Sequence, residues 1–259
     1  MRLEDIKNIG LLGGGAIGSG IAQALVVAGY KVIVRDLSDE ILNKMKDTII
    51  NGRFGLKGGV ERGKMTQKEM DEALARLSTT TRVEDLKNCD LIIEAIGGAS
   101  PDQLENKALK LKVFAELDRT IKKEAIFATN TSFFTVADLA RVTKRRDRFI
   151  GMHWFGPASI MKLVEIVYTA DVSEDLIKQF EEFGKKLGKT TIRVKDVPGD
   201  MGHVANRIFF RGARPEAERI VREGIATAED INTAMMLGFN WPRGPLPAEG
   251  TQARNPVTE

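Results

Sequence analysis

Residues 7–36 have the sequence KNIGLLGGGAIGSGIAQALVVAGYKVIVRD. The apolar run Lys7–Leu12 ends in glycines, and Ile17–Ala28 is a long segment rich in Ala, Ile, Leu and Val. A β-branched run, Lys31–Val34, follows. These patterns predict a buried strand, a buried helix and a second strand. Such a unit within about 30 residues is typical of a parallel sheet.

The turn between the first strand and the helix has the pattern G-x-G-x-x-G. Its first glycine permits a tight turn, its second lets the backbone approach a pyrophosphate, and its third lets the helix pack closely on the strand. The helix N-terminus offers unpaired N–H groups and a partial positive charge to phosphates. We therefore predict a dinucleotide-binding turn made of Gly13, Gly15, Ala16, Ile17 and Gly18.

An acidic residue at the end of the second strand narrows the choice of dinucleotide. Asp36 lies 18 residues after Gly18, where a carboxylate can accept hydrogen bonds from ribose hydroxyls. A carboxylate repels a 2′-phosphate, so Asp36 favours NAD over NADP, although the neighbouring Arg35 weakens this preference. A doubly wound sheet without a cofactor is the alternative interpretation of the motif.

The rest of the chain alternates between the two patterns. We predict strands and helices at Asp90–Ala95, Gln103–Asp118, Ala125–Thr129, Val136–Arg141, Phe149–His153, Leu163–Val167, Asp175–Leu187 and Thr190–Val194. Glu40–Leu77 has a helical composition that the glycine-rich, basic stretch Gly52–Gly63 interrupts. Strands that alternate with helices indicate an α/β class, namely a doubly wound Rossmann-like domain over residues 1–197.

The pattern becomes helical after this domain, over Ala205–Glu223 and Ala228–Met236. Arg211–Pro215 is expected to interrupt the first of these helices, because proline disrupts a helix interior. We expect a short, apparently truncated all-helical domain over residues 198–245 and a polar tail over residues 246–259.

Composition excludes several classes of protein. The 39 basic and 36 acidic residues give a net charge of +3, too small to favour nucleic acid as a partner. The basic run Lys144–Arg146 is expected to be a solvated surface turn rather than a phosphate site. We find neither a signal peptide nor an apolar stretch of about 18 residues, so no membrane partner is predicted. No metal site is predicted.

The single cysteine, Cys89, cannot form an internal disulfide, which fits a cytoplasmic location. It precedes an apolar strand, so we expect a packing role rather than a nucleophile.

A histidine and a glutamate mark a second candidate site. His153 ends an apolar strand, and Glu165 lies 12 residues further on, inside the apolar run LVEIV. A carboxylate in a strand core is costly unless it is paired. A His–Glu pair raises the basicity of the imidazole and fixes its tautomer, as proton abstraction requires. Spacing alone does not show whether the two residues touch, and a purely structural histidine is the alternative.

Four segments together resemble a known enzyme family. Residues 152–166, MHWFGPASIMKLVEI, resemble a conserved segment of the L-3-hydroxyacyl-CoA dehydrogenases, which include 3-hydroxybutyryl-CoA dehydrogenases. So do TNTS at 129–132, VPG at 197–199 with Asn206–Arg207, and the helical residues 217–245. The resemblance extends from about Ile6 to Pro245.

The resemblance implies roles for individual residues. His153 corresponds to the catalytic base and Glu165 to its carboxylate partner. Ser132 and Asn206 correspond to residues that bind the reacting substrate oxygen, although both could instead be helix caps. Further correspondences concern the cofactor, with Asp36 at the adenosine ribose, Asn130 among the cofactor-binding residues, and Glu105 and Lys110 at the nicotinamide side. Glu105 and Lys110 could instead be exposed helix charges.

The implied reaction is the NAD-dependent oxidation of an L-3-hydroxyacyl-CoA to a 3-ketoacyl-CoA, within fatty acid metabolism and β-oxidation. The basic stretch around Arg53 and Lys57 lies where the family binds coenzyme A, whose phosphates suit Lys and Arg. The same stretch contains Arg62, Lys64 and Lys68. The family also implies a homodimer, with its interface in the helical domain.

The sequence departs from the family at three places. Gly156 replaces an asparagine that contacts the cofactor, and the Asp200–His203 loop is longer, with His203 expected to be exposed. The chain also stops at Glu259, where the family continues for tens of residues. Two alternatives therefore stay open: an NAD- or acyl-CoA-binding protein with little turnover, and a dehydrogenase of a non-CoA 3-hydroxy acid.

Overall fold

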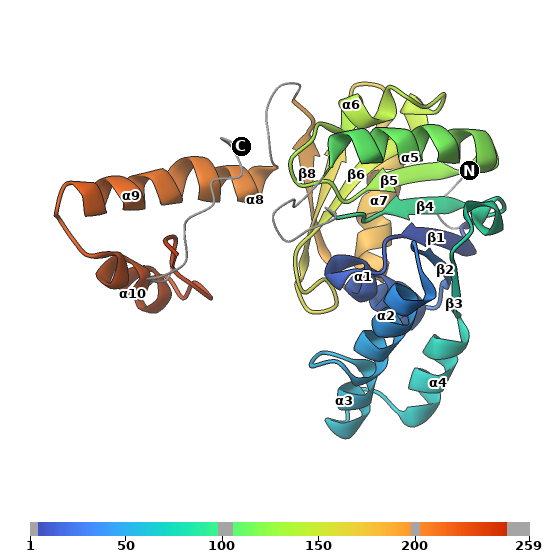
Figure 1. Cartoon of the computed structure of the whole chain (residues 1–259), viewed down its shortest axis with the longest axis horizontal. Coiled ribbons are helices and arrows are strands. Elements are labelled where there is room, and N and C mark those ends of the chain that lie inside the picture. Colours follow the sequence, from blue (N-terminus) through green and yellow to red (C-terminus); the bar gives the residue numbers. More distant parts are fainter. Residues whose placement is uncertain (1–4, 98–105, 198–202, 248–259) are drawn as a thin grey trace. The chain divides into compact units, whose positions relative to one another are not determined.

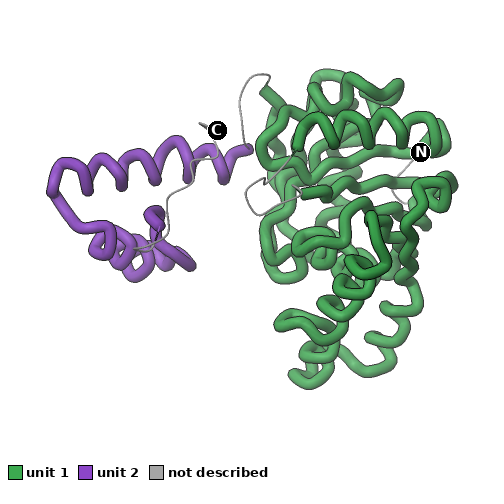
Figure 2. Tube along the Cα trace, in the orientation of Figure 1, with its two compact units in different colours: residues 1–200 green, residues 201–259 purple. Residues whose placement is uncertain are grey.

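The computed structural model describes residues 5–97, 106–197 and 203–247. The chain divides into two compact units, residues 1–200 and 201–259 (Figure 2). The first unit is a layered α/β structure, and the described part of the second is helical.

One eight-stranded sheet runs through the described part of the first unit, with the strand order β3-β2-β1-β4-β5-β6-β7-β8. The strands are β1 (Asn8–Leu12), β2 (Lys31–Arg35), β3 (Leu77–Thr80), β4 (Leu91–Glu94), β5 (Ile126–Thr129), β6 (Phe149–Trp154), β7 (Leu163–Tyr168) and β8 (Thr190–Lys195). All neighbouring pairs are parallel except β6 and β7, which are antiparallel. The strand order reverses between β1 and β4, and open α/β sheets bind their ligands at such a point.

Helices cover both faces of the sheet (Figure 1). Their bounds are α1 (Ala16–Val27), α2 (Asp39–Asn51), α3 (Leu56–Glu61), α4 (Gln67–Ala75), α5 (Lys107–Thr120), α6 (Val136–Ala140) and α7 (Glu174–Lys186). Short 3₁₀ turns lie at Val83–Leu86 and Arg146–Arg148. Helices α1, α2, α4 and α7 pack on one face, and α5 and α6 pack on the other. The predicted doubly wound architecture is therefore confirmed.

Burial explains why the central strands are almost wholly apolar. Every residue of β4, β5 and β6 is buried, because each strand is covered on both faces. One core contains Ile9, Leu25 and Phe180, and the other contains Phe114, Phe127 and Phe149. Cys89 is buried beside the second core, and burial raises the pKa of its thiol to about 12. The expected packing role fits this environment.

Two elements differ from the sequence-based expectation. Strand β3 was not predicted, because its four residues, LSTT, lie at the sheet edge and none of them is buried. The glycine-rich stretch after α2 was expected to interrupt helical structure, yet it contains the short helix α3.

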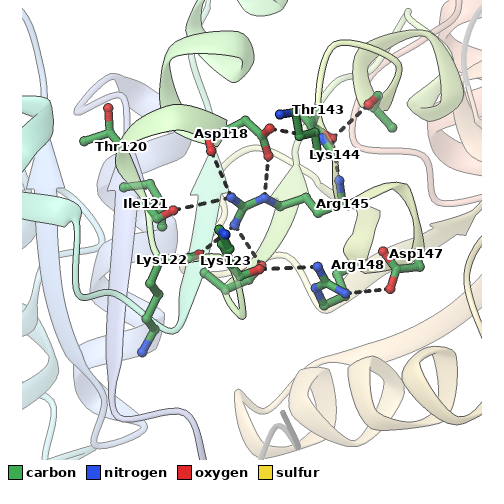
Figure 3. A network of polar contacts seen from close by, with 12 residues as sticks. Asp118, Thr120, Ile121, Lys122, Lys123, Thr143, Lys144, Arg145, Asp147 and Arg148 are labelled. Carbon is green, nitrogen blue, oxygen red and sulfur yellow. Dashed lines mark hydrogen bonds and ion pairs between the residues drawn. The ribbon is translucent and has the colours of Figure 1, made fainter.

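The basic run at 144–146 is not a solvated turn, because its central residue is buried. The Arg145 side chain is only 3% exposed, and its Nε donates a 2.7 Å hydrogen bond to the Asp118 carboxylate. Its guanidinium also donates to the carbonyls of Asp118, Ile121, Lys122 and Ala125 (Figure 3). Arg145 therefore binds carbonyl groups at the C-terminal end of α5 and in the segment that leads from it to β5. Lys144 and Arg146 are exposed, as expected.

The second unit contains helices α8 (Val204–Arg207), α9 (Arg214–Arg222) and α10 (Ala228–Gly238). A π-helical segment, Ile208–Ala213, joins α8 to α9, so helical structure passes through the expected interruption. Pro215 is the second residue of α9, directly after the π-helical segment.

A loop segment packs back onto α10. The amide of Asn232 exchanges two hydrogen bonds with the backbone of Leu246, at 3.0 and 3.1 Å. His203, expected to be exposed, is only 5% exposed and occupies the N-cap position of α8. None of the described helices is long and apolar enough to cross a membrane.

Candidate active site

The predicted site residues of the first unit gather at one edge of the sheet. The glycine turn follows β1, Asp36 follows β2, and Asn130 and Ser132 follow β5. His153 is the penultimate residue of β6. Because β7 runs antiparallel, its first half, with Glu165, lies at this same edge.

His153 and Glu165 face each other directly across β6 and β7. The Nδ1 atom of His153 lies 2.6 Å from Oε2 of Glu165. The two side chains are 3% and 0% exposed. An ionised carboxylate can only accept hydrogen bonds, so Nδ1 carries the proton and Nε2 presents its lone pair. The strand register thus selects the tautomer that a general base requires.

Ser132 completes this chain of contacts from the turn that follows β5. Its Oγ lies 3.0 Å from Nε2 of His153, and with the tautomer above the hydroxyl donates to that nitrogen. The alternative role of Ser132 as a helix cap is wrong, because the side chain of Thr135 caps α6. The imidazole is therefore held on both nitrogens, with Nε2 at the hydroxyl side.

The glycine turn has the shape that a dinucleotide requires. Gly13 has a φ of +100°, which side chains disfavour, and a Cβ on Gly18 would lie 1.9 Å from the carbonyl oxygen of Gly13. Helix α1 therefore packs directly on the turn. A Cβ on Gly15, the N-cap of α1, would meet no atom within 4 Å, so space is open above the helix N-terminus. The first turn of α1 contains no acidic residue, and its partial positive charge suits a pyrophosphate.

Asp36 is fixed beside this turn by two backbone groups. Its Oδ2 accepts a 2.6 Å hydrogen bond from the N–H of Gly14, and its Oδ1 accepts one of 2.6 Å from the N–H of Leu37. Each carboxylate oxygen keeps a second lone pair, which a ribose hydroxyl can use. The turn and Asp36 together fit NAD.

A buried ionic group lies at the ends of β4 and β5. Lys110, predicted as a cofactor contact or an exposed charge, is only 2% exposed and lies 2.5 Å from Oε1 of Glu94. Oε2 of Glu94 accepts a 2.6 Å hydrogen bond from Thr129, just before Asn130. The exposed alternative for Lys110 is therefore wrong. Glu94 was not singled out in the sequence, although it is, like Glu165, a carboxylate in an apolar strand.

The Asn130 side chain connects two strand ends. Its Oδ1 accepts a 2.7 Å hydrogen bond from the backbone N–H of Trp154, the residue after His153. This contact holds the end of β6 against the end of β5. A role of Asn130 in cofactor binding stays a prediction.

The remaining predicted residues belong to other elements. Arg53 and Lys57 are exposed around the start of α3, and Arg62, Lys64 and Lys68 are exposed between the end of α3 and the first turn of α4. Asn206 lies inside α8 of the second unit, so its alternative role as an N-cap is wrong. Glu105 lies outside the described residues.

Comparison with known proteins decides the family. Residues 8–197 match the 3-hydroxyacyl-CoA dehydrogenase NAD binding domain, and residues 202–248 match the C-terminal domain of the same family. The chain belongs to the 3-hydroxyacyl-CoA dehydrogenase family. It is therefore an NAD-dependent oxidoreductase, and the alternative of a binding protein with little turnover is not favoured.

Individual relatives agree with this assignment. The mitochondrial hydroxyacyl-coenzyme A dehydrogenase of Sus scrofa is 36% identical over 93% of this chain and 74% of its own length. A probable 3-hydroxybutyryl-CoA dehydrogenase of Bacillus subtilis is 36% identical over 93% of this chain and 79% of its own. The crystal structure of the (S)-3-hydroxybutyryl-CoA dehydrogenase of Ralstonia eutropha superposes with a TM-score of 0.83, at 38% identity, over 93% of this chain and 81% of that one.

Proposed function

We propose that this 3-hydroxyacyl-CoA dehydrogenase oxidises L-3-hydroxyacyl-CoA thioesters with His153 as the general base. The observation that carries the proposal is the continuous contact from Glu165 through His153 to Ser132. Glu165 fixes the tautomer, and a substrate hydroxyl can bind the lone pair of Nε2 once it displaces the hydroxyl of Ser132. When bound, NAD supplies the acceptor for the hydride that leaves C3.

Side chains of this protein accept the proton of the substrate hydroxyl and stabilise the charge that results. Nε2 of His153 takes the proton of the C3 hydroxyl as the ketone forms, and the buried carboxylate of Glu165 stabilises the resulting imidazolium. The hydroxyl of Ser132, already at Nε2, can donate a hydrogen bond to the reacting oxygen once the substrate hydroxyl binds the imidazole. Asn206 is proposed to bind the same oxygen.

The acyl carrier is proposed to bind through basic residues around α3. Arg53 and Lys57 are both exposed, and their charges suit the phosphates of coenzyme A. The relatives are named as dehydrogenases of coenzyme A thioesters, which supports this choice over a free 3-hydroxy acid. We place the reaction in fatty acid β-oxidation.

Residues 1–197 are proposed as the NAD-binding domain and residues 198–245 as the helical domain, with a tail after them. A homodimer is proposed to form through the helical domain. Its apolar side chains Ile208, Ile225, Leu237 and Phe239 are 65–81% exposed, which is unusual for large apolar residues that have no partner. The single, buried cysteine agrees with the proposed cytoplasmic location.

The proposed reaction is tested by following NADH oxidation with acetoacetyl-CoA and longer 3-ketoacyl-CoA thioesters. We expect saturable turnover with the thioesters and much lower kcat/KM with free acetoacetate. Tight NADH binding without turnover would overturn the proposal and restore the binding-protein alternative.

A further inference from the structure

A buried lysine outside the proposed catalytic group contacts the loop that joins its two halves. Lys189 lies between α7 and β8 and is only 7% exposed. Its Nζ donates a 2.7 Å hydrogen bond to the carbonyl of Ala158 and one of 2.8 Å to the carbonyl of Met161. Both acceptors belong to the loop of residues 155–162, which leads from β6 to β7.

This loop connects the two paired strands that carry His153 and Glu165. It turns sharply, since the N–H groups of Ile160 and Met161 both donate to the carbonyl of Pro157. The two carbonyls that Lys189 binds belong to residues of this turn, one directly after Pro157 and one at its end. One ammonium group therefore holds the turn closed from within.

The opposite side of the same loop packs on the cofactor-binding helix. A Cβ on Gly20 of α1 would lie 2.8 Å from the backbone nitrogen of Ser159, so helix and loop are in direct contact. A Cβ on Gly156 would lie 3.0 Å from the side chain of Ile17, near the start of α1. The loop thus contacts both α1 and Lys189. It therefore links the helix that follows the dinucleotide turn to the two strands that carry His153 and Glu165.

Burial of the Lys189 ammonium group at this position costs free energy. Burial lowers the pKa of Lys189, and the nearby charge of Lys162 lowers it further. Among the described residues its Nζ contacts the two carbonyls and the face of the Trp154 ring, 5.4 Å from the ring centroid, and no carboxylate. Burying a cation without an anionic partner costs free energy that an apolar side chain would not. What an apolar side chain cannot supply is the pair of hydrogen bonds to the loop.

We propose that Lys189 is a positioning residue, which holds the 155–162 loop so that His153 and Glu165 stay aligned with each other and with helix α1. The proposal deepens the proposed function, because it assumes that His153 acts as the base. It assigns no contact between Lys189 and the substrate or the cofactor.

The test compares Lys189→Met with Lys162→Met in the full chain. Methionine keeps most of the apolar stem and removes the donors. Lys162 is an exposed lysine of the same loop whose side chain makes no hydrogen bond or ion pair among the described residues. We measure kcat with acetoacetyl-CoA, the isotope effect on kcat with NADH deuterated at the transferred position, NADH affinity, thermal unfolding, and deuterium exchange in the loop peptide.

For Lys189→Met we expect at least a tenfold fall in kcat, a larger isotope effect, faster loop exchange and NADH affinity within threefold of the unmodified enzyme. Lys162→Met should stay within twofold in every measurement. A larger isotope effect means that hydride transfer itself has slowed, which a smaller folded fraction cannot produce. Unchanged loop exchange, or a fall in kcat with an unchanged isotope effect, would overturn the proposal.

Lys189→Arg keeps the charge and the donors, and covers the case in which the methionine variant does not fold. If both variants fold, Lys189→Arg should show slower loop exchange and a higher kcat than Lys189→Met. If Lys189→Met does not fold, Lys189→Arg should still fold. Arginine and methionine variants equally impaired would contradict a role for the donors. If the unmodified enzyme does not reduce acetoacetyl-CoA, the proposed function is wrong, and loop exchange still tests the contact of Lys189.

Discussion

Oε2 of Glu165 lies 2.6 Å from Nδ1 of His153, because the two residues are opposite each other in the antiparallel pair β6 and β7. Both side chains are almost fully buried, so the contact does not compete with water. The carboxylate therefore acts on the imidazole at short range and in low dielectric surroundings.

This contact predicts the behaviour of Glu165→Gln. The amide can donate to Nδ1 and so favour the tautomer that leaves no lone pair on Nε2, and it cannot stabilise an imidazolium. We expect kcat to fall about 10²-fold or more, within the range of lost acid–base catalysis, with NADH affinity nearly unchanged. Steady-state kinetics and NADH fluorescence measure both. Glu182→Gln, which replaces an exposed carboxylate of α7, is the matched control. Equal activity of the two variants would contradict the role of Glu165.

Two glycine-to-alanine substitutions in the glycine turn are expected to affect different properties, one NADH binding and the other stability. Gly15→Ala adds a methyl group where no atom lies within 4 Å, so stability should not change but NADH should bind at least tenfold more weakly. Gly18→Ala places a methyl group 1.9 Å from a carbonyl oxygen and should destabilise the fold by about 1–3 kcal/mol or more. Calorimetry and NADH titration separate the effects. Full NADH affinity in Gly15→Ala would show that the cofactor does not occupy this space.

Removal of the Arg145 guanidinium, whose contacts Figure 3 shows, is expected to lower stability without lowering kcat. Arg145→Met removes the cation from the largely buried carboxylate of Asp118, which keeps only a hydrogen bond from the N–H of Lys144, and should lower the free energy of unfolding by about 3–5 kcal/mol. Arg146→Met, its exposed neighbour, should change it by less than about 0.5 kcal/mol. Urea unfolding gives the comparison, and kcat per folded molecule should match the unmodified enzyme. Similar stabilities of the two variants would contradict the account of this group.

The contacts of Asp90 predict that part of the free energy of unfolding is lost at acidic pH. Burial raises the pKa of this carboxyl, but Lys122 and the backbone N–H groups of Asn8 and Lys7 lower it more, so its folded pKa lies below the ordinary value of about 3.9. The unfolded chain then binds the proton more readily, and the stabilisation present at neutral pH is lost as the pH falls through the folded pKa. Asp90→Asn should be less stable at pH 7, with the difference shrinking below about pH 4. A difference independent of pH would contradict this assignment.

Much of this structure could be predicted from local patterns. The strand–helix–strand unit at residues 7–36 was predicted because its apolar runs, glycines and final acid all indicate the same structure. The orientation of β7 was not predicted, although a signal was present. The connection of residues 155–162 is too short for a parallel crossover, so it requires antiparallel strands and thereby places Glu165 opposite His153.

Burial of charged residues was harder to predict. Arg145 lies in a basic run that resembles a solvated turn, and only the folded chain brings the carbonyls at the end of α5 to it. Lys110 and Lys189 occur in ordinary polar sequence, and their partners, Glu94 and the 155–162 loop, are distant along the chain. Strand β3 lacks an apolar pattern because it lies at an edge.

The central claim is that Nε2 of His153 removes the proton of the substrate hydroxyl. It is tested most directly by His153→Ala, in parallel assays of acetoacetyl-CoA reduction and NADH binding. We predict that kcat falls by about 10²- to 10⁴-fold while NADH binds as tightly as before. An unchanged kcat in this variant, with the fold intact, would contradict the claim.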